Sequence, residues 1–482
     1  MTATEATSPA PPSDHVRALV GRGTLYSLAT AMQLLVAIIA LPIVTRLLPI
    51  AAYGEIAVAI VVQLVLALVA SVGLPEVLTR TFFKTADGSR RAAALVALVV
   101  ATSTAVAGLA DLTGSRWSTS LLGLAYTAPL RLAVWSSVPL AVLLTAQALL
   151  RARDRAAAFV LSAALATAGT QAAGVIAIVT SERTSAAYMA GFLAGTILAA
   201  TVTVAASGIA LRPLRDVRFV RSTLRISLPV VAHSVSLYVI WAGNRAVLTR
   251  LEGRAAAATF QVAYLVGGLT VLFVSAVYGA WSPIVLGADE RRWITLAETS
   301  RVVYRFVAAA TSAVALAAPV ALLVLAPSTY DPRALASTSS IVSLSAIPFA
   351  VYTASVLVVI WYGRTVALAV ATSVAACANV AINLILIPHF GLNGAAAASV
   401  ISYTLQALLV GGIAQRLAAV PSTGAVLFRV TAGTCAAVAA AEAMPTSLPW
   451  LVVRVGAALI LLGWLVRAAL RIRSSGATGA LK

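Results

Sequence analysis

Tyr238, Trp241 and Arg245 fall on one face of the helix expected over residues 227–248. At about 100° per residue, Ser234 and Arg245 lie within about 40° of Tyr238, and Trp241 lies within about 60° of it. The two aromatic rings could stack on sugar rings, and the guanidinium offers paired N–H donors that match a phosphate. This stripe is a candidate binding surface for a molecule that carries both sugars and phosphate.

A weaker stripe of the same kind lies near the N-terminus. In and just before the apolar stretch 24–44, Tyr26 and Gln33 share a narrow polar face with Arg22. We take all three as further substrate-binding candidates, with Gln33 the best placed. An amide in a packed span also commonly bonds to a neighbouring helix. A packing role is therefore the competing interpretation for Gln33.

The amino-acid composition indicates that the helices with these stripes span a membrane. Of 482 residues, 61% are hydrophobic and 10% are charged, whereas an ordinary soluble domain has roughly 25% charged residues. Apolar runs of about 18 residues or more recur, each long enough to cross a hydrocarbon core about 30 Å thick. Since no water satisfies backbone groups inside a bilayer, runs this long must be helical. The sequence thus predicts an all-α, polytopic membrane protein with about fourteen transmembrane helices, near residues 24–44, 54–74, 92–111, 128–149, 157–180, 187–208, 227–248, 259–283, 304–326, 339–362, 366–387, 393–413, 425–443 and 449–469.

The basic residues give these helices an orientation. Most of the 34 Lys and Arg fall in loops on one side of the predicted membrane. The bias of Lys and Arg toward cytoplasmic loops then places both termini in the cytoplasm. The net charge of +19 is explained by this topology and by contact with anionic lipid headgroups. Nucleic acid is not an expected partner.

Arg245 has a competing interpretation in this topology. It lies about 30 Å along an ideal helix from Arg225, so its side chain could extend to the outer membrane interface instead of facing a cavity. The depth of Tyr238 and Trp241 favours the cavity only slightly, and both interpretations stay open on the sequence. We interpret four other polar residues in the spans as packing contacts rather than ligands, namely His233, Asn244, Asn379 and Asn383.

A repeat divides the chain into two halves. Residues 45–55 read TRLLPIAAYGE and residues 249–259 read TRLEGRAAAAT, a displacement of 204 positions. Six predicted spans separate the copies, so both have the same orientation, and a parallel repeat implies two bundles around a central cavity. We expect the following order along the chain: a disordered cytoplasmic tail (1–21), a six-helix bundle (22–210), a basic cytoplasmic linker (211–226), a second six-helix bundle (227–416), two appended helices (425–470) and a cytoplasmic tail (471–482).

Three stretches carry a family resemblance. They are TRLLPIAAYGEIAVAIVVQLVLALVASVGLPEVLTR (45–80), LPVVAHSVSLYVIWAGNRAVLTRLEG (228–253) and NLILIPHFGLNGAAAASVISY (383–403). Together they resemble bacterial polysaccharide flippases, which belong to the multidrug/oligosaccharidyl-lipid/polysaccharide exporter (MOP) superfamily. One position departs from the pattern: many relatives have an acidic residue before the arginine of the seventh span, where this chain has Asn244.

The resemblance implies a function. It implies that the protein moves a lipid-linked oligosaccharide, carried on undecaprenyl diphosphate, from the cytoplasmic to the outer leaflet of the bacterial cell membrane by alternating access. Lipid II flippases and the multidrug and toxin extrusion antiporters belong to the same superfamily and are the alternatives. The implied partners are the lipid-linked substrate, membrane lipids and proteins of polysaccharide assembly, and the expected state is a monomer.

The acidic residues bear on these alternatives. The fifteen Asp and Glu lie in the tail, in loops or near span ends. A proton-coupled exporter of cationic drugs is expected to hold a buried carboxylate, so the antiporter interpretation is disfavoured. No predicted loop has room for a catalytic or metal site. We therefore expect a transporter rather than an enzyme, with no cofactor and no metal.

Overall fold

The computed structural model describes residues 36, 38–84, 88–208 and 217–479, and the regular secondary structure within them is helical. Residues Ile38–Leu47 form a short apolar helix. The remaining elements are α2 (Ile50–Ala70), α3 (Leu74–Lys84), α4 (Gly88–Leu112), α5 (Gly114–Trp117), η1 (Ser118–Leu122), α6 (Ala128–Ala152), α7 (Ala156–Ala164), η2 (Leu165–Gly169), α8 (Thr170–Thr180), α9 (Ser185–Ser207), α10 (Val217–Glu252), α11 (Arg254–Gly267), α12 (Leu269–Leu286), η3 (Asp289–Arg291), α13 (Arg292–Leu325), η4 (Ser328–Tyr330), α14 (Leu335–Ser343), α15 (Ala346–Trp361), α16 (Thr365–Leu417), α17 (Gly424–Ala443) and α18 (Leu448–Gly479).

These helices confirm the predicted all-α, multi-pass class. Among the described residues, eleven helices are long and apolar enough to cross a membrane, or twelve if one bent pair counts as a single span. The number fourteen itself stays a prediction. Most of the first predicted span, 24–44, lies outside the described residues, and the predicted spans 366–387 and 393–413 form the single element α16.

The 53 residues of α16 fold as a helical hairpin. Gly391 has non-helical backbone angles inside it (φ 54°, ψ −131°), in the positive-φ region that glycine tolerates best. In a straight helix, Asn379 and Ser402 would lie about 34 Å apart, yet Asn379 Nδ2 donates to Ser402 Oγ at 3.0 Å. The chain therefore reverses at Gly391, and the two arms pack side by side.

The helix α10 is the long element that carries the predicted stripe. It begins at Val217, ten residues before the predicted span and inside the stretch predicted as a linker. It is bent by 40° between Arg225 and Ser227, because Pro229 has no N–H to donate to the carbonyl four residues earlier and its ring crowds that carbonyl. Beyond the bend, α10 packs along α16.

Polar side chains join α10 to both arms of the α16 hairpin. Asn244 Nδ2 donates to Ser399 Oγ at 2.7 Å, and Asn383 Nδ2 donates to Asn244 Oδ1 at 2.9 Å. Nearer the start of α10, His233 Nδ1 and Thr372 Oγ1 are 3.0 Å apart. These contacts confirm the packing role predicted for the asparagines and His233. An amide buried in a membrane is costly unless it is paired in this way.

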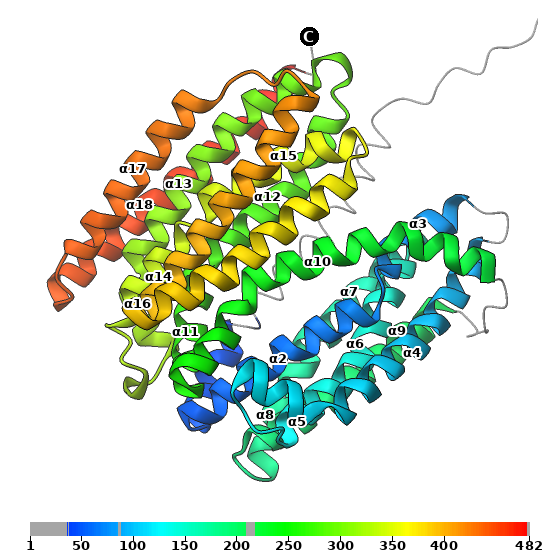
Figure 1. The fold of residues 1–482 in the computed structure, drawn as a ribbon. Coiled ribbons are helices and arrows are strands. Elements are labelled where there is room, and N and C mark those ends of the chain that lie inside the picture. The colour runs from blue at the N-terminus through cyan, green and yellow to red at the C-terminus, as the bar shows by residue number, and fades with distance from the viewer. Residues whose placement is uncertain (1–35, 37, 85–87, 209–216, 480–482) are drawn as a thin grey trace, which may run out of the picture.

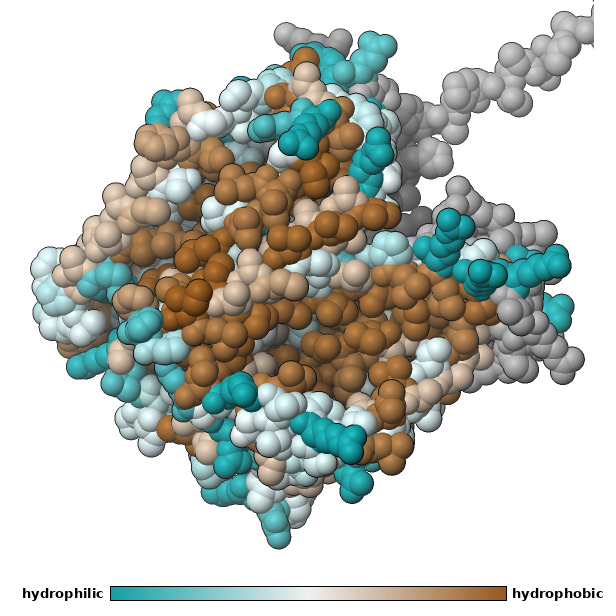
Figure 2. All heavy atoms as spheres, in the orientation of Figure 1, coloured by the Kyte–Doolittle hydropathy of each residue, from teal (hydrophilic) through white to brown (hydrophobic). Residues whose placement is uncertain are grey.

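Figure 1 shows the helices in two groups. The first group comprises Ile38–Leu47 and α2 to α9, and the second comprises α10 to α18, with α10 lying along the boundary. We call the end where α10 begins the Val217 end, and the end where α10 finishes and α2 and α11 begin the Ile50 end. Hydrophobic residues cover the middle of the face in Figure 2, and hydrophilic residues gather toward its two ends. This distribution suits a bilayer around the middle. The predicted domain boundaries stay a prediction.

The two groups meet closely at the Ile50 end. The helix α2 begins at Ile50 and α11 begins at Arg254, 204 positions later, which is the displacement of the sequence repeat. The two helices cross at Gly54, where an added Cβ would lie 1.8 Å from the carbonyl oxygen of Arg254. Only a glycine allows so close an approach of two backbones. Equivalent helices of the repeat therefore cross each other at this point.

Candidate functional site

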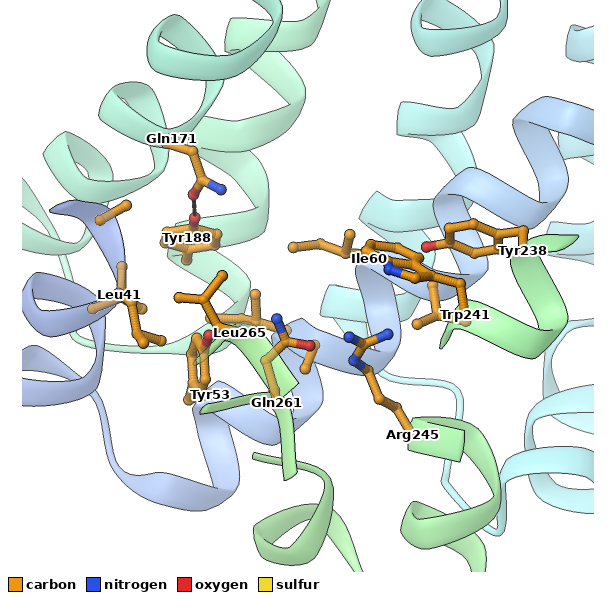
Figure 3. Close-up of a pocket in the computed structure, with 15 residues that line it drawn as sticks. Leu41, Tyr53, Ile60, Gln171, Tyr188, Tyr238, Trp241, Arg245, Gln261 and Leu265 are labelled. Carbon is orange, nitrogen blue, oxygen red and sulfur yellow. Dashed lines mark hydrogen bonds between the residues drawn. The ribbon is translucent and has the colours of Figure 1, made fainter. Parts of the chain in front are cut away.

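A cavity of about 110 Å³ lies between the two groups of helices. Figure 3 shows its walls, which come from the helix Ile38–Leu47, α2, α8, α9, α10 and α11. This volume has room for a few water molecules or for one small polar group. The cavity in the described structure is thus narrow, and it must widen before a sugar chain could pass. The lining residues are Ala40, Leu41, Val44, Tyr53, Ile56, Ala57, Ile60, Val61, Gln171, Tyr188, Tyr238, Trp241, Arg245, Gln261 and Leu265.

Arg245 is the charged residue of this cavity. Its side chain points toward Trp241 and the space beside Gln261 (Figure 3), and the residue is 3% exposed. A side chain reaching the membrane interface would be exposed, so the structure favours the cavity interpretation of Arg245. Within the described part of the chain, Nε has no hydrogen-bond partner and no carboxylate pairs with the guanidinium. Among the described residues, therefore, no acidic side chain neutralises the charge of Arg245 in the cavity.

Aromatic rings hold this guanidinium in place. Its carbon lies 5.1 Å from the centroid of Trp241 and 4.9 Å from that of Tyr264, within the range of cation–π attraction. Trp241 in turn packs against Tyr238, with ring centroids 5.3 Å apart. Such contacts orient a cation without using its N–H donors. The N–H groups of Arg245 consequently stay available for an anion in the cavity.

Four polar residues of the cavity were not predicted from the sequence. Tyr53 comes from α2, Gln171 from α8, Tyr188 from α9 and Gln261 from α11. The hydroxyl of Tyr188 donates to Oε1 of Gln171. A search of the spans for mid-helix amides would have found the two glutamines, because such residues are rare in apolar helices and generally face the interior. Nothing comparable in the sequence marks the two tyrosines as cavity residues.

Equivalent positions of the sequence repeat line the cavity. Three pairs of its lining residues are 204 positions apart: Leu41 with Arg245, Ala57 with Gln261, and Val61 with Leu265. Equivalent positions of the two halves therefore face one space. In the first two pairs the polar member belongs to the second half, so equivalent positions of the two halves differ in polarity.

This arrangement is suited to binding an anion. One buried guanidinium, amides and phenol hydroxyls supply hydrogen-bond donors, and none of the fifteen lining residues is acidic. Within the described residues, no three His, Cys, Asp or Glu side chains gather in a group that could hold a metal ion. A phosphate between Trp241 and Gln261 would receive charge-assisted hydrogen bonds from Arg245.

Comparison with known proteins identifies the family. Polysaccharide biosynthesis proteins form a family whose pattern matches residues 20–286, more than half of the chain. The chain belongs to this family. No curated protein matches it. The match begins before the described residues and ends at the last residue of α12, so it includes the stripe on α10 and all the walls of the cavity.

Solved structures share the fold of this family member. An inward-closed structure of the lipid II flippase MurJ aligns with a TM-score of 0.71 at 12% identity, over 93% of this chain and 99% of MurJ. An inward-facing multidrug resistance MATE family transporter of the MOP superfamily aligns at 0.61 and 15% identity, over 81% and 96%. A MOP superfamily transporter from Pyrococcus furiosus aligns at 0.54 and 15% identity, over 83% and 96%. These likenesses show that this chain shares the fold of these proteins.

Only some of the predicted site residues line the cavity in the described structure. Tyr238, Trp241 and Arg245 come together in the cavity of this polysaccharide biosynthesis protein. Ser234 lies one turn before Tyr238, is partly buried, and is not among the lining residues. The first-span candidates Arg22, Tyr26 and Gln33 lie outside the described residues.

Proposed function

We propose that this protein flips a lipid-linked oligosaccharide, carried on undecaprenyl diphosphate, from the cytoplasmic to the outer leaflet of the bacterial cell membrane. The observation that carries the proposal is the buried guanidinium of Arg245, paired with no carboxylate of the described residues, in a cavity between the two groups of helices. The family supplies the context of polysaccharide biosynthesis. The fold, shared with the MurJ flippase and MATE transporters, supports alternating access.

A buried arginine is costly in a membrane, and binding of a diphosphate would offset that cost. A charged residue at mid-membrane costs about 2.5–3.5 kcal/mol on insertion scales. A diphosphate entering the cavity loses its hydration and needs a cation and N–H donors in exchange. Arg245 meets both needs, while Tyr238 and Trp241 offer faces on which the first sugar can stack. The polyprenyl tail would stay in the surrounding lipid, because a hydrocarbon chain is more stable there than in a cavity with polar walls.

Charge supports the proposed orientation. Basic side chains gather at the Val217 end: Arg91 lies 4.7 Å from the ring of Phe219, Arg292 lies 3.5 Å from the ring of Trp361, and Arg153 and Arg155 donate to the carbonyls that end α9. We place this end in the cytoplasm because Lys and Arg concentrate there. The Ile50 end then faces outward. The close crossing of α2 and α11 at Gly54 then lies on the outer side of the cavity.

Lipid II is the second candidate substrate. It is also a polyprenyl diphosphate carrying sugars, and the structure of a lipid II flippase aligns over nearly the whole chain. The two candidates share the chemistry that Arg245 would recognise. Export of cationic drugs is less consistent with the site, since a cation would meet a guanidinium and no lining carboxylate. We propose transport rather than catalysis, by a monomer working beside polysaccharide assembly proteins.

Thermal unfolding of the purified protein tests this recognition. We expect a short-chain polyprenyl diphosphate to stabilise the wild type, by about 2.7 kcal/mol at a hundred times its dissociation constant, and to leave Arg245→Ala unchanged. A cationic amphiphile of equal chain length should stabilise neither. Arg116→Ala is the matched control, because Arg116 is exposed on α5 and away from the cavity. Equal stabilisation by the cationic amphiphile would contradict the proposal.

A further inference from the structure

Two arginines bridge the two groups of helices at the Ile50 end. Arg46, just before α2, donates from Nη2 to the carbonyl oxygen of Val324 in α13 at 3.0 Å. Arg250, near the end of α10, donates from Nη1 to the carbonyl oxygen of Ser120 in η1. The first bond runs from the first group to the second, and the other runs in the opposite direction. Each group therefore contributes one donor and one acceptor.

The two bridges are equivalent under the sequence repeat. Arg46 and Arg250 are 204 positions apart, and so are Ser120 and Val324. The preceding threonines match as well, since Thr45 and Thr249 each donate to the carbonyl four residues earlier, at 2.9 and 2.7 Å. The Thr-Arg-Leu motif that reveals the repeat in the sequence is thus the motif that forms the bridges.

We propose that these reciprocal bridges form a latch that holds the Ile50 end closed and that must release for this end to open. The proposal concerns the conformational cycle and is independent of which cargo is carried. Opening this end separates the first group from the second, and both arginine bonds cross that boundary. Because each bridge is repeated across the axis, the two should contribute equally to closure.

The acceptors explain why arginine occupies these positions. Val324 is the penultimate residue of α13, and Ser120 lies in the last turn of η1. Carbonyls in a final helical turn lack intrahelical donors and carry the negative end of the helix dipole. A guanidinium satisfies them well. Both arginines are exposed at this end, so each bond is weak enough to break during a transport cycle.

Glu55 provides a third contact across the same boundary. Its Oε2 lies 3.7 Å from Nη1 of Arg254 on α11. Within its own group, Glu55 accepts hydrogen bonds from the hydroxyls of Thr127 at 2.7 Å and Ser185 at 2.6 Å. Thr127 is the N-cap residue of α6, and Ser185 is the first residue of α9. The carboxylate thereby ties three helices of the first group together where the latch acts, so that they can move as one body.

Distance measurements by electron spin resonance test the latch without a transport assay. Spin labels are placed at Arg183→Cys, before α9, and Arg333→Cys, before α14, in a background with Cys377→Ala and Cys435→Ala; all four side chains are exposed. We expect Arg46→Ala and Arg250→Ala each to lower the ratio of short to long distances by about threefold, and the double variant to lower it by about tenfold.

Arg116→Ala is the control, because it removes an exposed charge from α5, beside η1, and breaks no bridge. It should leave the distance distribution of the parent unchanged. The latch is refuted if the double variant keeps the distribution of the parent, or if Arg116→Ala shifts it as far as the double variant does. Markedly unequal effects of the two single variants would also contradict the proposal. A failed flippase assay would leave these readouts unaffected.

Discussion

Replacing Arg245 by Ala is expected to lower glycan export by about tenfold to a hundredfold at unchanged protein level. The variant removes the buried guanidinium that lines the cavity. Charge-assisted hydrogen bonds to a bound diphosphate are worth about 1.5–3 kcal/mol, and 1.4 kcal/mol is a factor of ten. The measurement is complementation of a flippase-deficient strain, with the amount of protein in the membrane determined beside glycan export.

Arg245→Lys separates a specific phosphate contact from a general need for charge. We expect it to restore export only in part, because Lys keeps the charge but loses the paired donors and the planar group that packs between Trp241 and Tyr264. Arg116→Ala, at an exposed position, should export like the wild type. Full export by Arg245→Ala would remove this residue from the site.

Gly54→Ala is expected to impair export nearly as strongly. The added Cβ would lie 1.8 Å from the carbonyl oxygen of Arg254, whereas ordinary contacts begin at 3.4 Å. The helices α2 and α11 must therefore separate, which disturbs the cavity that both line. Overpacking of this kind costs about 1–3 kcal/mol. Complementation and thermal unfolding of the purified variant check the effect.

The matched control is Gly108→Ala on α4. A Cβ at Gly108 meets nothing within 4 Å, so this variant should export normally, and its melting temperature should stay level or rise because Ala is the better helix former. If Gly54→Ala and Gly108→Ala behaved alike, the close crossing at Gly54 would not matter for function.

The sequence predicted those features that depend on one helix or on the repeat. The stripe of Tyr238, Trp241 and Arg245 could be found because helical periodicity alone places them on one face. The packing of Asn244 and Asn379 followed from the cost of an unpaired amide in a membrane. The hairpin in α16 was indicated by the two apolar runs on either side of IPHFG. Each of these signals is local.

The features that the sequence did not reveal depend on contacts between distant helices. The stripe on α10 extends over Ser234, but Ser234 is not among the described residues that line the cavity. Gln171 and Gln261 lie on helices whose facing could not be assigned without knowing how the two groups meet. The bridges from Arg46 and Arg250 likewise could not be predicted, because their acceptors, Val324 and Ser120, lie far from them in the sequence.

Flipping in proteoliposomes tests the central claim most directly. The purified protein is reconstituted with a fluorescent undecaprenyl-diphosphate oligosaccharide in both leaflets, and a membrane-impermeant quencher is added outside. We predict that wild-type vesicles lose the fluorescence of both leaflets, while Arg245→Ala vesicles lose mainly that of the outer leaflet, as protein-free vesicles do. Wild-type vesicles that keep their inner-leaflet fluorescence, or Arg245→Ala vesicles that lose it at the wild-type rate, would contradict the account.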